Sequence, residues 1–229
     1  MEGKIYSISL GGSLLMNSKM EFNLDFIREF KNLIKNRVEA GDKFIFTVGG
    51  GKTARFYQTA GRGLGFNQEQ LDRLGVKSTY VNAELVRLAL EVEDEVYYSP
   101  EDLPKELSKS IYICSGWKPG WSTDYVATFA ANHIKSKYVV NLSNTDYIYD
   151  SDPDENPEAQ KLEKLTWVGY HKMIGVSEWS PGIHVPFDPI ASRLAMENNM
   201  TLFYLNGHDL RNLKKFFAGE DFIGTTIQE

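Results

Sequence analysis

The sequence has little of several features that mark large protein classes. It contains a single cysteine, Cys114, so no disulfide can form within the chain. Cys114 lies in the apolar run IYICSG and is predicted to be a buried, unreactive thiol. No apolar run approaches the roughly 20 residues that span a bilayer. We therefore expect a protein with no membrane partner, located in the cytoplasm.

Positive charge is also scarce. The 229 residues include 25 Lys and Arg against 31 Asp and Glu, giving a net charge of −6. This balance argues against a nucleic-acid partner, because no basic face dominates. The four histidines are scattered and are interpreted as structural, so no protein-held metal site is predicted. Internal repeats and a Ser-His-Asp pattern are not found.

Strand-like and helix-like segments alternate along almost the whole chain. Strands are expected at residues 4–10, 44–48, 95–98, 110–114, 138–142, 200–205 and 222–227. Helices are expected at 24–40, 52–62, 68–90, 123–133, 189–198 and 209–217, the third with a break considered near Gly75. The acidic, proline-containing stretch 150–164 is expected to be an exposed excursion. The pattern predicts one α/β domain with three αβα layers and a mostly parallel central sheet.

The most informative segment is FIFTVGGGKTAR, residues 44–55. Three glycines follow a β-type run just where a helix is expected to begin. Glycines strip side chains from the backbone, so main-chain N–H groups and the positive end of a helix dipole can face an anion. Lys52 and Arg55 add positive charge at the same place. The segment predicts a phosphate site.

Two nucleotide-binding motifs, the P-loop and the dinucleotide fingerprint, fit the glycines of this chain less well. Gly51-Lys52-Thr53 ends as a P-loop ends, but the motif requires glycine at position 46, which is Phe. The spacing Gly61-x-Gly63-x-Gly65 follows a helix and not a strand, so it reads as a helix-terminating loop.

Three further segments follow predicted strands and are candidates for the same ligand site. They are 11–13 (GGS), 116–124 (GWKPGWSTD) and 141–153 (NLSNTDYIYDSDP). The second opens a helix with hydroxyls and a cap, a second possible phosphate seat. The third is polar and carries Tyr149, suited to flank a base. Each segment also has an interpretation without a ligand: 11–13 as a simple turn, 116–124 as an ordinary capped helix, and 141–153 as a solvated turn. In parallel sheets, ligands bind at the carboxyl ends of strands, where all these segments fall.

Taken in order, these segments resemble the amino acid kinase superfamily and, within it, the archaeal-type uridylate kinases. The matching segments are 11–13, 49–55, 71–75, 118–124, 144–153 and 188–191. The resemblance runs from Lys4 to the GTTI near the end of the chain. It implies the fold of that superfamily over residues 1–229, with an N-terminal acceptor lobe of about 1–135 and a C-terminal ATP lobe of about 136–229. It also implies a homo-oligomer, usually a hexamer.

The resemblance implies a role for each matching residue. Those expected to bind ATP are Ser9, Leu10, Gly11, Gly12, Ser13, Gly51, Arg55, Ser143, Asn144, Tyr149 and Asp152. Those expected to bind UMP are Gly50, Asp72, Trp117, Lys118, Pro119, Gly120, Trp121, Ser122 and Thr123. Lys52, Arg55 and Lys118 are the candidates for catalytic cations. The implied reaction moves the γ-phosphoryl group of ATP to UMP, with Mg²⁺ bound through the ATP phosphates.

Three positions depart from the pattern of the uridylate kinases. Many members carry Lys where this chain has Ser9, glycine where it has Tyr147, and Lys where it has Arg193. These departures keep two other hypotheses open. One is a kinase of a different small phosphorylated or acidic metabolite, and the other is a relative that binds or stores anions or nucleotides without catalysis.

Overall fold

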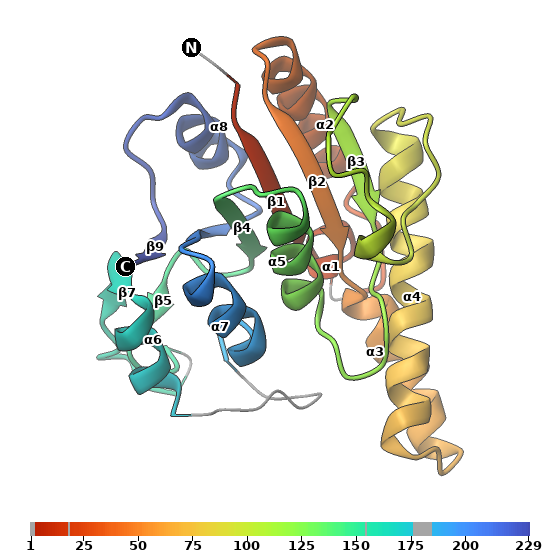
Figure 1. Ribbon diagram of the computed structural model, residues 1–229. Helices are drawn as coiled ribbons and strands as arrows, with labels where there is room; N and C mark the ends of the chain where they lie inside the picture. The colour runs from red at the N-terminus through yellow and green to blue at the C-terminus, as the bar shows by residue number, and fades with distance from the viewer. Residues whose placement is uncertain (1–2, 18, 154, 176–184) are drawn as a thin grey trace.

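The computed structural model describes residues 3–17, 19–153, 155–175 and 185–229. Its core is a seven-stranded sheet in the order β3-β2-β1-β4-β8-β9-β7 (Figure 1). These strands are β1 (Ile5–Leu10), β2 (Lys43–Val48), β3 (Ile111–Cys114), β4 (Tyr138–Ser143), β7 (Lys164–Thr166), β8 (Thr201–Asn206) and β9 (Thr225–Gln228). The five strands from β3 to β8 run parallel, and β8 pairs antiparallel with β9. The predicted mostly parallel sheet is confirmed.

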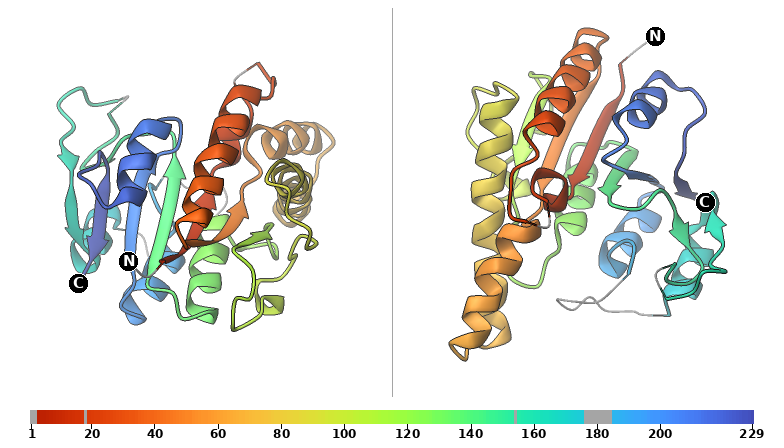
Figure 2. Two further views of the ribbon diagram at one scale, coloured as in Figure 1. Left: turned by 90° about the horizontal axis from the view of Figure 1, so that it is seen from above. Right: turned by 180° about the vertical axis from the view of Figure 1, so that it is seen from behind.

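Helices cover both faces of this sheet. They are α1 (Gly12–Leu15), α2 (Leu24–Glu39), α3 (Gly51–Gly63), α4 (Gln68–Ala89), α5 (Thr123–His133), α6 (Trp167–Ile174), α7 (Pro189–Glu197) and α8 (Leu210–Ala218), with a 3₁₀ turn at η1 (Pro100–Asp102). Helices α5 and α7 lie on one face, and α2 and α8 on the other (Figures 1 and 2). This is the three-layer arrangement that the alternating segments predicted.

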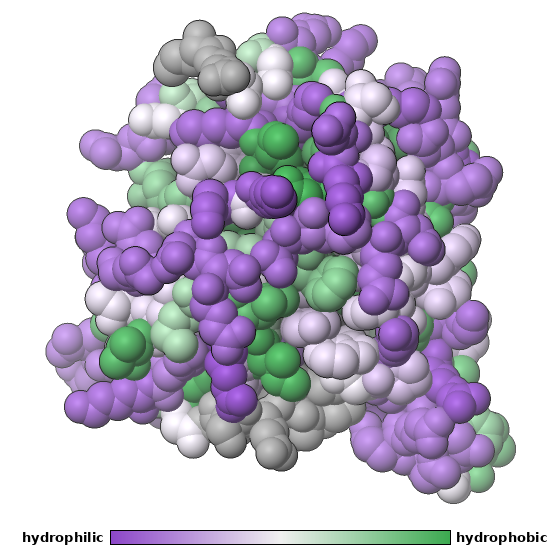
Figure 3. All heavy atoms as spheres, in the orientation of Figure 1, coloured by the Kyte–Doolittle hydropathy of each residue, from purple (hydrophilic) through white to green (hydrophobic). Residues whose placement is uncertain are grey.

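The inner strands are buried on both faces, which is why their sequences read as nearly continuous apolar runs. Five of the six residues in each of β1 and β2 are buried. On one face Ile8 and Phe46 pack with Phe30 of α2 and Phe216 of α8. A second cluster on the other face joins β4 and β8 to α7. The surface in Figure 3 is mostly hydrophilic, with apolar side chains gathered near its centre.

Helices α3 and α4 form a hairpin that projects past the carboxyl edge of the sheet (Figures 1 and 2). Contrary to the break considered near Gly75, α4 runs through this residue without interruption. A Cβ at Gly75 would lie 2.8 Å from Nε2 of Gln58, so glycine lets α3 approach closely. Within the described chain, no helix combines the length and apolar composition needed to cross a membrane.

Two predicted strands differ from those observed. Residues 95–98 form a single bridge, Tyr97 to Cys114, because the chain turns into η1 at Pro100. Strand β9 begins at Thr225 and not at residue 222. The Asn212 side chain bonds both the N–H and the carbonyl of Ile223, so this backbone does not join a ladder.

The part between β4 and α7 holds elements that the periodicity did not reveal. Two very short strands, β5 (Ile148–Tyr149) and β6 (Lys161–Leu162), pair antiparallel in a separate small sheet. Strand β7 and helix α6 follow. Elements of two to eight residues are too short to show a hydrophobic period, as is the four-residue α1. Most of the predicted excursion at 150–164 is exposed, as expected.

Candidate functional site

The glycine segments after β1 and β2 touch backbone to backbone. A Cβ at Gly12 would lie 2.3 Å from the carbonyl oxygen of Gly49 and 2.6 Å from the nitrogen of Gly51. Gly51 has φ of +52°, and a Cβ there would lie 2.3 Å from the Gly12 carbonyl carbon. No larger residue fits either position without moving main chain. The two segments therefore form one rim, which we call the glycine rim (residues 11–13 and 49–51).

Asn82 of α4 holds the second half of the glycine rim from below. Its side-chain amide donates to the carbonyls of Gly49, at 2.8 Å, and Gly50, at 3.1 Å. Its oxygen accepts from the Thr53 hydroxyl at 3.2 Å. Because both carbonyl oxygens accept from Asn82, they point toward α4 and not toward a ligand at the rim. Asn82 could not be predicted from the sequence, because a buried polar residue in a helix has no local signature.

Helix α3 begins at the glycine rim and offers its N-terminus to an anion. Gly50 is its N-cap, its first turn holds no acidic residue, and no described side chain caps it. The start of α5 differs. The Ser122 hydroxyl accepts from the N–H of Tyr125, and Asp124 lies in the first turn. Because a cap and a carboxylate already occupy α5, the α3 start is the better phosphate seat of the two that the sequence offered.

A polar layer lies beneath the glycine rim. One carboxylate oxygen of Asp124 accepts from the Ser9 hydroxyl and from the Asn141 amide, both at 2.7 Å. Burial, followed by the nearby carboxylate of Asp188, raises the pKa of Asp124 to about 6. Asp188 caps α7 by accepting from the N–H groups of Ile190 and Ala191. The Ser9 side chain, predicted to face phosphate, is thus directed toward Asp124.

The loop between β3 and α5 is tied to α4 at two points. The N–H of Gly116 donates to the Thr79 hydroxyl at 2.7 Å, and the N–H of Gly120 donates to the Asp72 carboxylate at 2.5 Å. Burial raises the pKa of Asp72. Asp72 and this loop, predicted to bind the same ligand, are therefore brought together by the fold.

The three candidate cations lie around the glycine rim and not within it. Lys52 and Arg55 line a surface groove of α3 together with Met20 and Phe56. The Lys118 ammonium lies 3.9 Å from the ring centroid of Trp117, a cation–π contact. Arg55 and Lys118 are exposed and Lys52 is half-buried, and side chains of this length reach a ligand by rotating about their own bonds.

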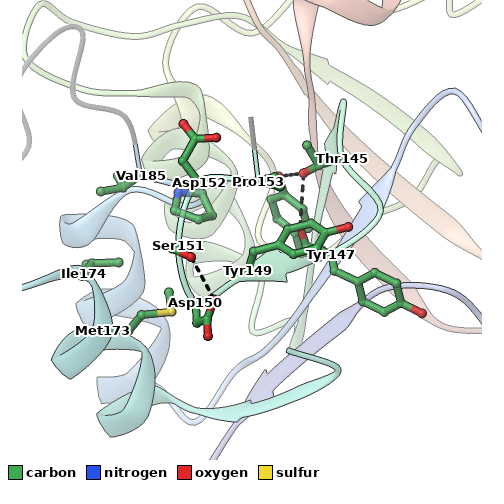
Figure 4. Close-up of a pocket in the computed structure, with 12 residues that line it drawn as sticks. Thr145, Tyr147, Tyr149, Asp150, Ser151, Asp152, Pro153, Met173, Ile174 and Val185 are labelled. Carbon is green, nitrogen blue, oxygen red and sulfur yellow. Dashed lines mark hydrogen bonds between the residues drawn. The ribbon is translucent and has the colours of Figure 1, made fainter. Parts of the chain in front are cut away.

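A cavity of about 470 Å³ lies beyond the carboxyl end of β4 (Figure 4). Tyr149 and Asp152 line it, as the sequence predicted for the base end of a nucleotide, and Met173 of α6 forms part of another wall. Tyr147 also lines it, with its ring 6.4 Å from that of Tyr149 and in edge contact. This volume lies in the usual range for a small-molecule site.

Ser13 connects the glycine rim to the segment that follows β4. Its hydroxyl donates to the side-chain oxygen of Asn144 at 3.0 Å. The Gly11 N–H donates to the carbonyl of Leu142, joining the ends of β1 and β4. The fold therefore brings Ser13 and Asn144, both predicted to bind ATP, into contact.

Known proteins resemble this chain along most of its length. The model of the amino acid kinase family matches residues 7–206. A uridylate kinase from Methanobrevibacter smithii is 29% identical over 225 residues, covering 96% of this chain and 97% of the relative. One from Sulfurisphaera tokodaii is 32% identical over 214 residues, covering 91% and 93%.

Solved structures show the same fold. The crystal structure of uridylate kinase from Archaeoglobus fulgidus has a TM-score of 0.77 at 27% identity, covering 98% of this chain and 99% of the other. UMP kinase from Bacillus anthracis has a TM-score of 0.81 at 21% identity, covering 100% and 97%, a likeness of fold. Because the family model matches residues 7–206, most of the sequence, the chain belongs to the amino acid kinase family.

Proposed function

We propose that this protein is a UMP kinase, a phosphotransferase that moves the γ-phosphoryl group of ATP to UMP and releases UDP and ADP. The observation that carries this proposal is the convergence of the glycine rim, the uncapped start of α3 and the loop tied to Asp72 at one sheet edge. Uridylate kinases that align along nearly the whole chain support it.

The two nucleotides meet at the glycine rim. ATP takes the side of β1 and β4, with its phosphates near Gly12 and Gly51 and its base end in the cavity lined by Tyr149. UMP takes the side of α3 and α4, near Gly50 and the loop anchored by Asp72. The hydrogen bond between Ser13 and Asn144 joins the two segments that we assign to the donor.

The chemistry requires positioning more than proton transfer. The acceptor oxygen belongs to a phosphate that is largely dianionic at neutral pH, so no general base is needed. The main barrier is repulsion between two anionic groups that approach in line. Backbone N–H groups at the start of α3 and the cations Lys52, Arg55 and Lys118 reduce this repulsion. Asp124 is engaged by Ser9 and Asn141, and it holds the floor of the site in place.

The ATP phosphates would carry Mg²⁺ into this site. The described residues contain no group of three or more His, Cys, Asp or Glu that could hold a metal ion. Mg²⁺ keeps several waters and commonly binds through substrate phosphates, so the proposed reaction requires no cluster of protein ligands for it. When bound, it neutralises charge on the transferring phosphoryl group.

The assembly we infer is a homo-oligomer in the cytoplasm, a hexamer by its resemblance to uridylate kinases. Large apolar side chains exposed on α3, at its C-cap and on α4 support self-association. They are Phe56 of α3 at 62% exposure, the C-cap residue Leu64 at 73%, and Val81 and Leu88 of α4 at 67% and 59%. Light scattering of the purified protein distinguishes a hexamer from a monomer.

A coupled assay of ADP release tests the proposed reaction. UMP, CMP, AMP and small carboxylate acceptors are each supplied with ATP and Mg²⁺. Turnover that is fastest with UMP supports the proposal. Tight nucleotide binding without turnover refutes it in favour of a non-catalytic relative, and preferential turnover of another acceptor refutes the assignment of the substrate.

A further inference from the structure

A cavity of about 150 Å³ lies at the amino edge of the sheet, away from the glycine rim. Tyr6 and Tyr138, near the amino ends of β1 and β4, line it together with Gly219 and Glu220, which follow α8. Helix α8 lies beside the amino end of β1 (Figures 1 and 2). Because the cavity is smaller than the roughly 300 Å³ at which drug-sized pockets begin, it suits a small ligand and not a nucleotide.

Aromatic rings form most of the wall of this cavity. They belong to Tyr6, Tyr138, Phe203, Phe216 and Phe222. The first four contact one another in a closed sequence, with neighbouring centroids 5.8, 6.0, 4.9 and 5.8 Å apart. The face of an aromatic ring attracts a cation, and the Lys4 ammonium already lies 5.6 Å from the ring centroid of Tyr138. The wall therefore favours a ligand with a positive charge.

Negative charge lies beside these rings. The Glu220 carboxylate lines the cavity, and its side chain is exposed. Helix α8 ends at Gly219, so the negative end of its dipole is at the same place. A cationic group held against the rings would face both Glu220 and this helix end.

Lys4 and Glu220 line one cavity but do not pair. Among the described residues, neither of these two side chains takes part in an ion pair. A simple cation would be attracted by Glu220 and repelled by Lys4. A ligand with a positive and a negative end satisfies both side chains at once.

The Tyr6 hydroxyl is a further group without a partner. The Tyr6 side chain lines the cavity and is only 2% exposed, yet its hydroxyl forms no hydrogen bond to any residue that the structure describes. Burial raises the pKa of Tyr6 to about 12, so the hydroxyl keeps its proton at neutral pH and can donate. Buried polar groups nearly always have partners, and a ligand oxygen would supply the missing one.

We propose that this cavity binds a small zwitterion of the betaine class, a methylated ammonium group joined to a carboxylate by a short spacer. The methylated ammonium group contacts the aromatic rings and faces Glu220. The carboxylate faces the Lys4 ammonium and accepts from the Tyr6 hydroxyl. None of these residues was assigned to ATP or UMP, so the inference stands apart from the proposed reaction.

Calorimetry with three ligands of nearly the same shape tests the proposal. Glycine betaine carries both charges, choline has a hydroxyl in place of the carboxylate, and tert-butylacetate has carbon in place of the charged nitrogen. We expect glycine betaine to bind about tenfold more tightly than tert-butylacetate, because a cation–π contact out of water is lost, and more tightly than choline. Equal affinity for glycine betaine and either analogue overturns the assignment of a zwitterion, as does an absence of saturable binding of glycine betaine.

Two variants separate the two ends of the ligand. Glu220→Gln should weaken glycine betaine and choline severalfold and leave tert-butylacetate unchanged. Tyr6→Phe keeps the ring and should weaken glycine betaine and tert-butylacetate about tenfold, with choline unchanged, because only the carboxylate loses a charge-assisted hydrogen bond. A variant that weakens all three ligands equally contradicts the role given to its side chain.

Asp221→Asn is the matched control for Glu220→Gln. Asp221 is the next residue, is exposed and does not line the cavity. This variant removes the same charge and should bind all three ligands like the parent protein, and an effect equal to that of Glu220→Gln overturns the assignment of Glu220. Urea unfolding checks that each variant is folded, and the exposed position of Glu220 keeps the test available if Tyr6→Phe does not fold.

Discussion

Replacing Gly12 by alanine places a methyl group inside the contact between the two halves of the glycine rim. The new Cβ lies 2.3 Å from the carbonyl oxygen of Gly49, about 1.1 Å short of an ordinary contact of 3.4 Å. The obstructing atoms belong to main chain and not to a flexible side chain. Gly12 has no positive φ, so the strain comes from crowding and not from the conformation of alanine itself.

The expected magnitude follows from two opposing effects. Overpacking a fitted site costs about 1–3 kcal/mol. Loss of the conformational freedom of glycine in the unfolded chain offsets about 0.4–1 kcal/mol of this. We therefore expect Gly12→Ala to lower the free energy of unfolding by about 1–2 kcal/mol. The effect on kcat/KM is larger, about a hundredfold, because a shift of 1 Å at the rim misaligns the phosphoryl transfer.

Gly63→Ala is the control for this substitution. Gly63 lies at the end of α3, has no positive φ, and a Cβ there meets nothing within 4 Å. Alanine at this position should raise stability by up to about 1 kcal/mol and leave kcat/KM unchanged. Urea unfolding and the ADP-release assay measure both variants. If Gly12→Ala keeps kcat/KM within twofold of the parent, the rim does not set the geometry of transfer.

Three further predictions concern charged residues of the site. Because the pKa of Asp124 is raised above its unfolded value, the folded state binds more protons between pH 4 and about 6, and this residue destabilises the fold as pH rises. Asp124→Asn keeps an acceptor for Ser9 but cannot ionise. The free energy of unfolding of this variant, measured with urea, should therefore rise relative to that of the parent from pH 4 to pH 8. A difference that stays constant over this range contradicts the raised pKa. Asp72→Ala frees the Gly120 N–H and should raise KM for UMP about tenfold, at 1.4 kcal/mol for one charge-assisted hydrogen bond, with KM for ATP unchanged. Equal changes in both KM values count against the acceptor assignment. Arg55→Ala should reduce kcat about a hundredfold and leave urea unfolding unchanged, as expected for a charge that stabilises the transition state. Arg62→Ala, on the same helix, is the control and should leave kcat unchanged. Equal rates in the two variants remove Arg55 from the site.

The sequence predicted the parts of the fold that rest on local patterns. Strands β1 and β2 and helix α5 match their predicted ranges within one or two residues, because long apolar runs and the Ser122 cap are visible in the chain. Cys114 is buried, as expected, and burial raises the pKa of its thiol. The short elements between β4 and α7 were not predicted, because their pairing depends on contacts between residues far apart.

In the candidate site, too, features with a local sequence pattern could be predicted, and features that depend on distant contacts could not. Its glycines could be found from sequence, since they mark where each strand ends. The direction of the Ser9 side chain toward Asp124 could not, because it depends on the register between β1, β4 and α5. Likewise, nothing local to Asn82 indicates that it supports two rim carbonyls 32 and 33 positions away. The roles of individual residues toward ATP and UMP stay predictions.

The reversal of strand direction at β9 divides the sheet into two parts. Strands β1, β2, β3, β4 and β8 end at the edge that carries the glycine rim, whereas β7 and β9 point the opposite way. The cavity lined by Tyr149 draws on the parallel strands and on elements added beside them, because Tyr204 of β8 lines it together with Tyr149 of β5 and Met173 of α6. A substitution at Met173 therefore reshapes a wall that stands outside the five parallel strands, and it leaves the backbone contacts of the glycine rim untouched.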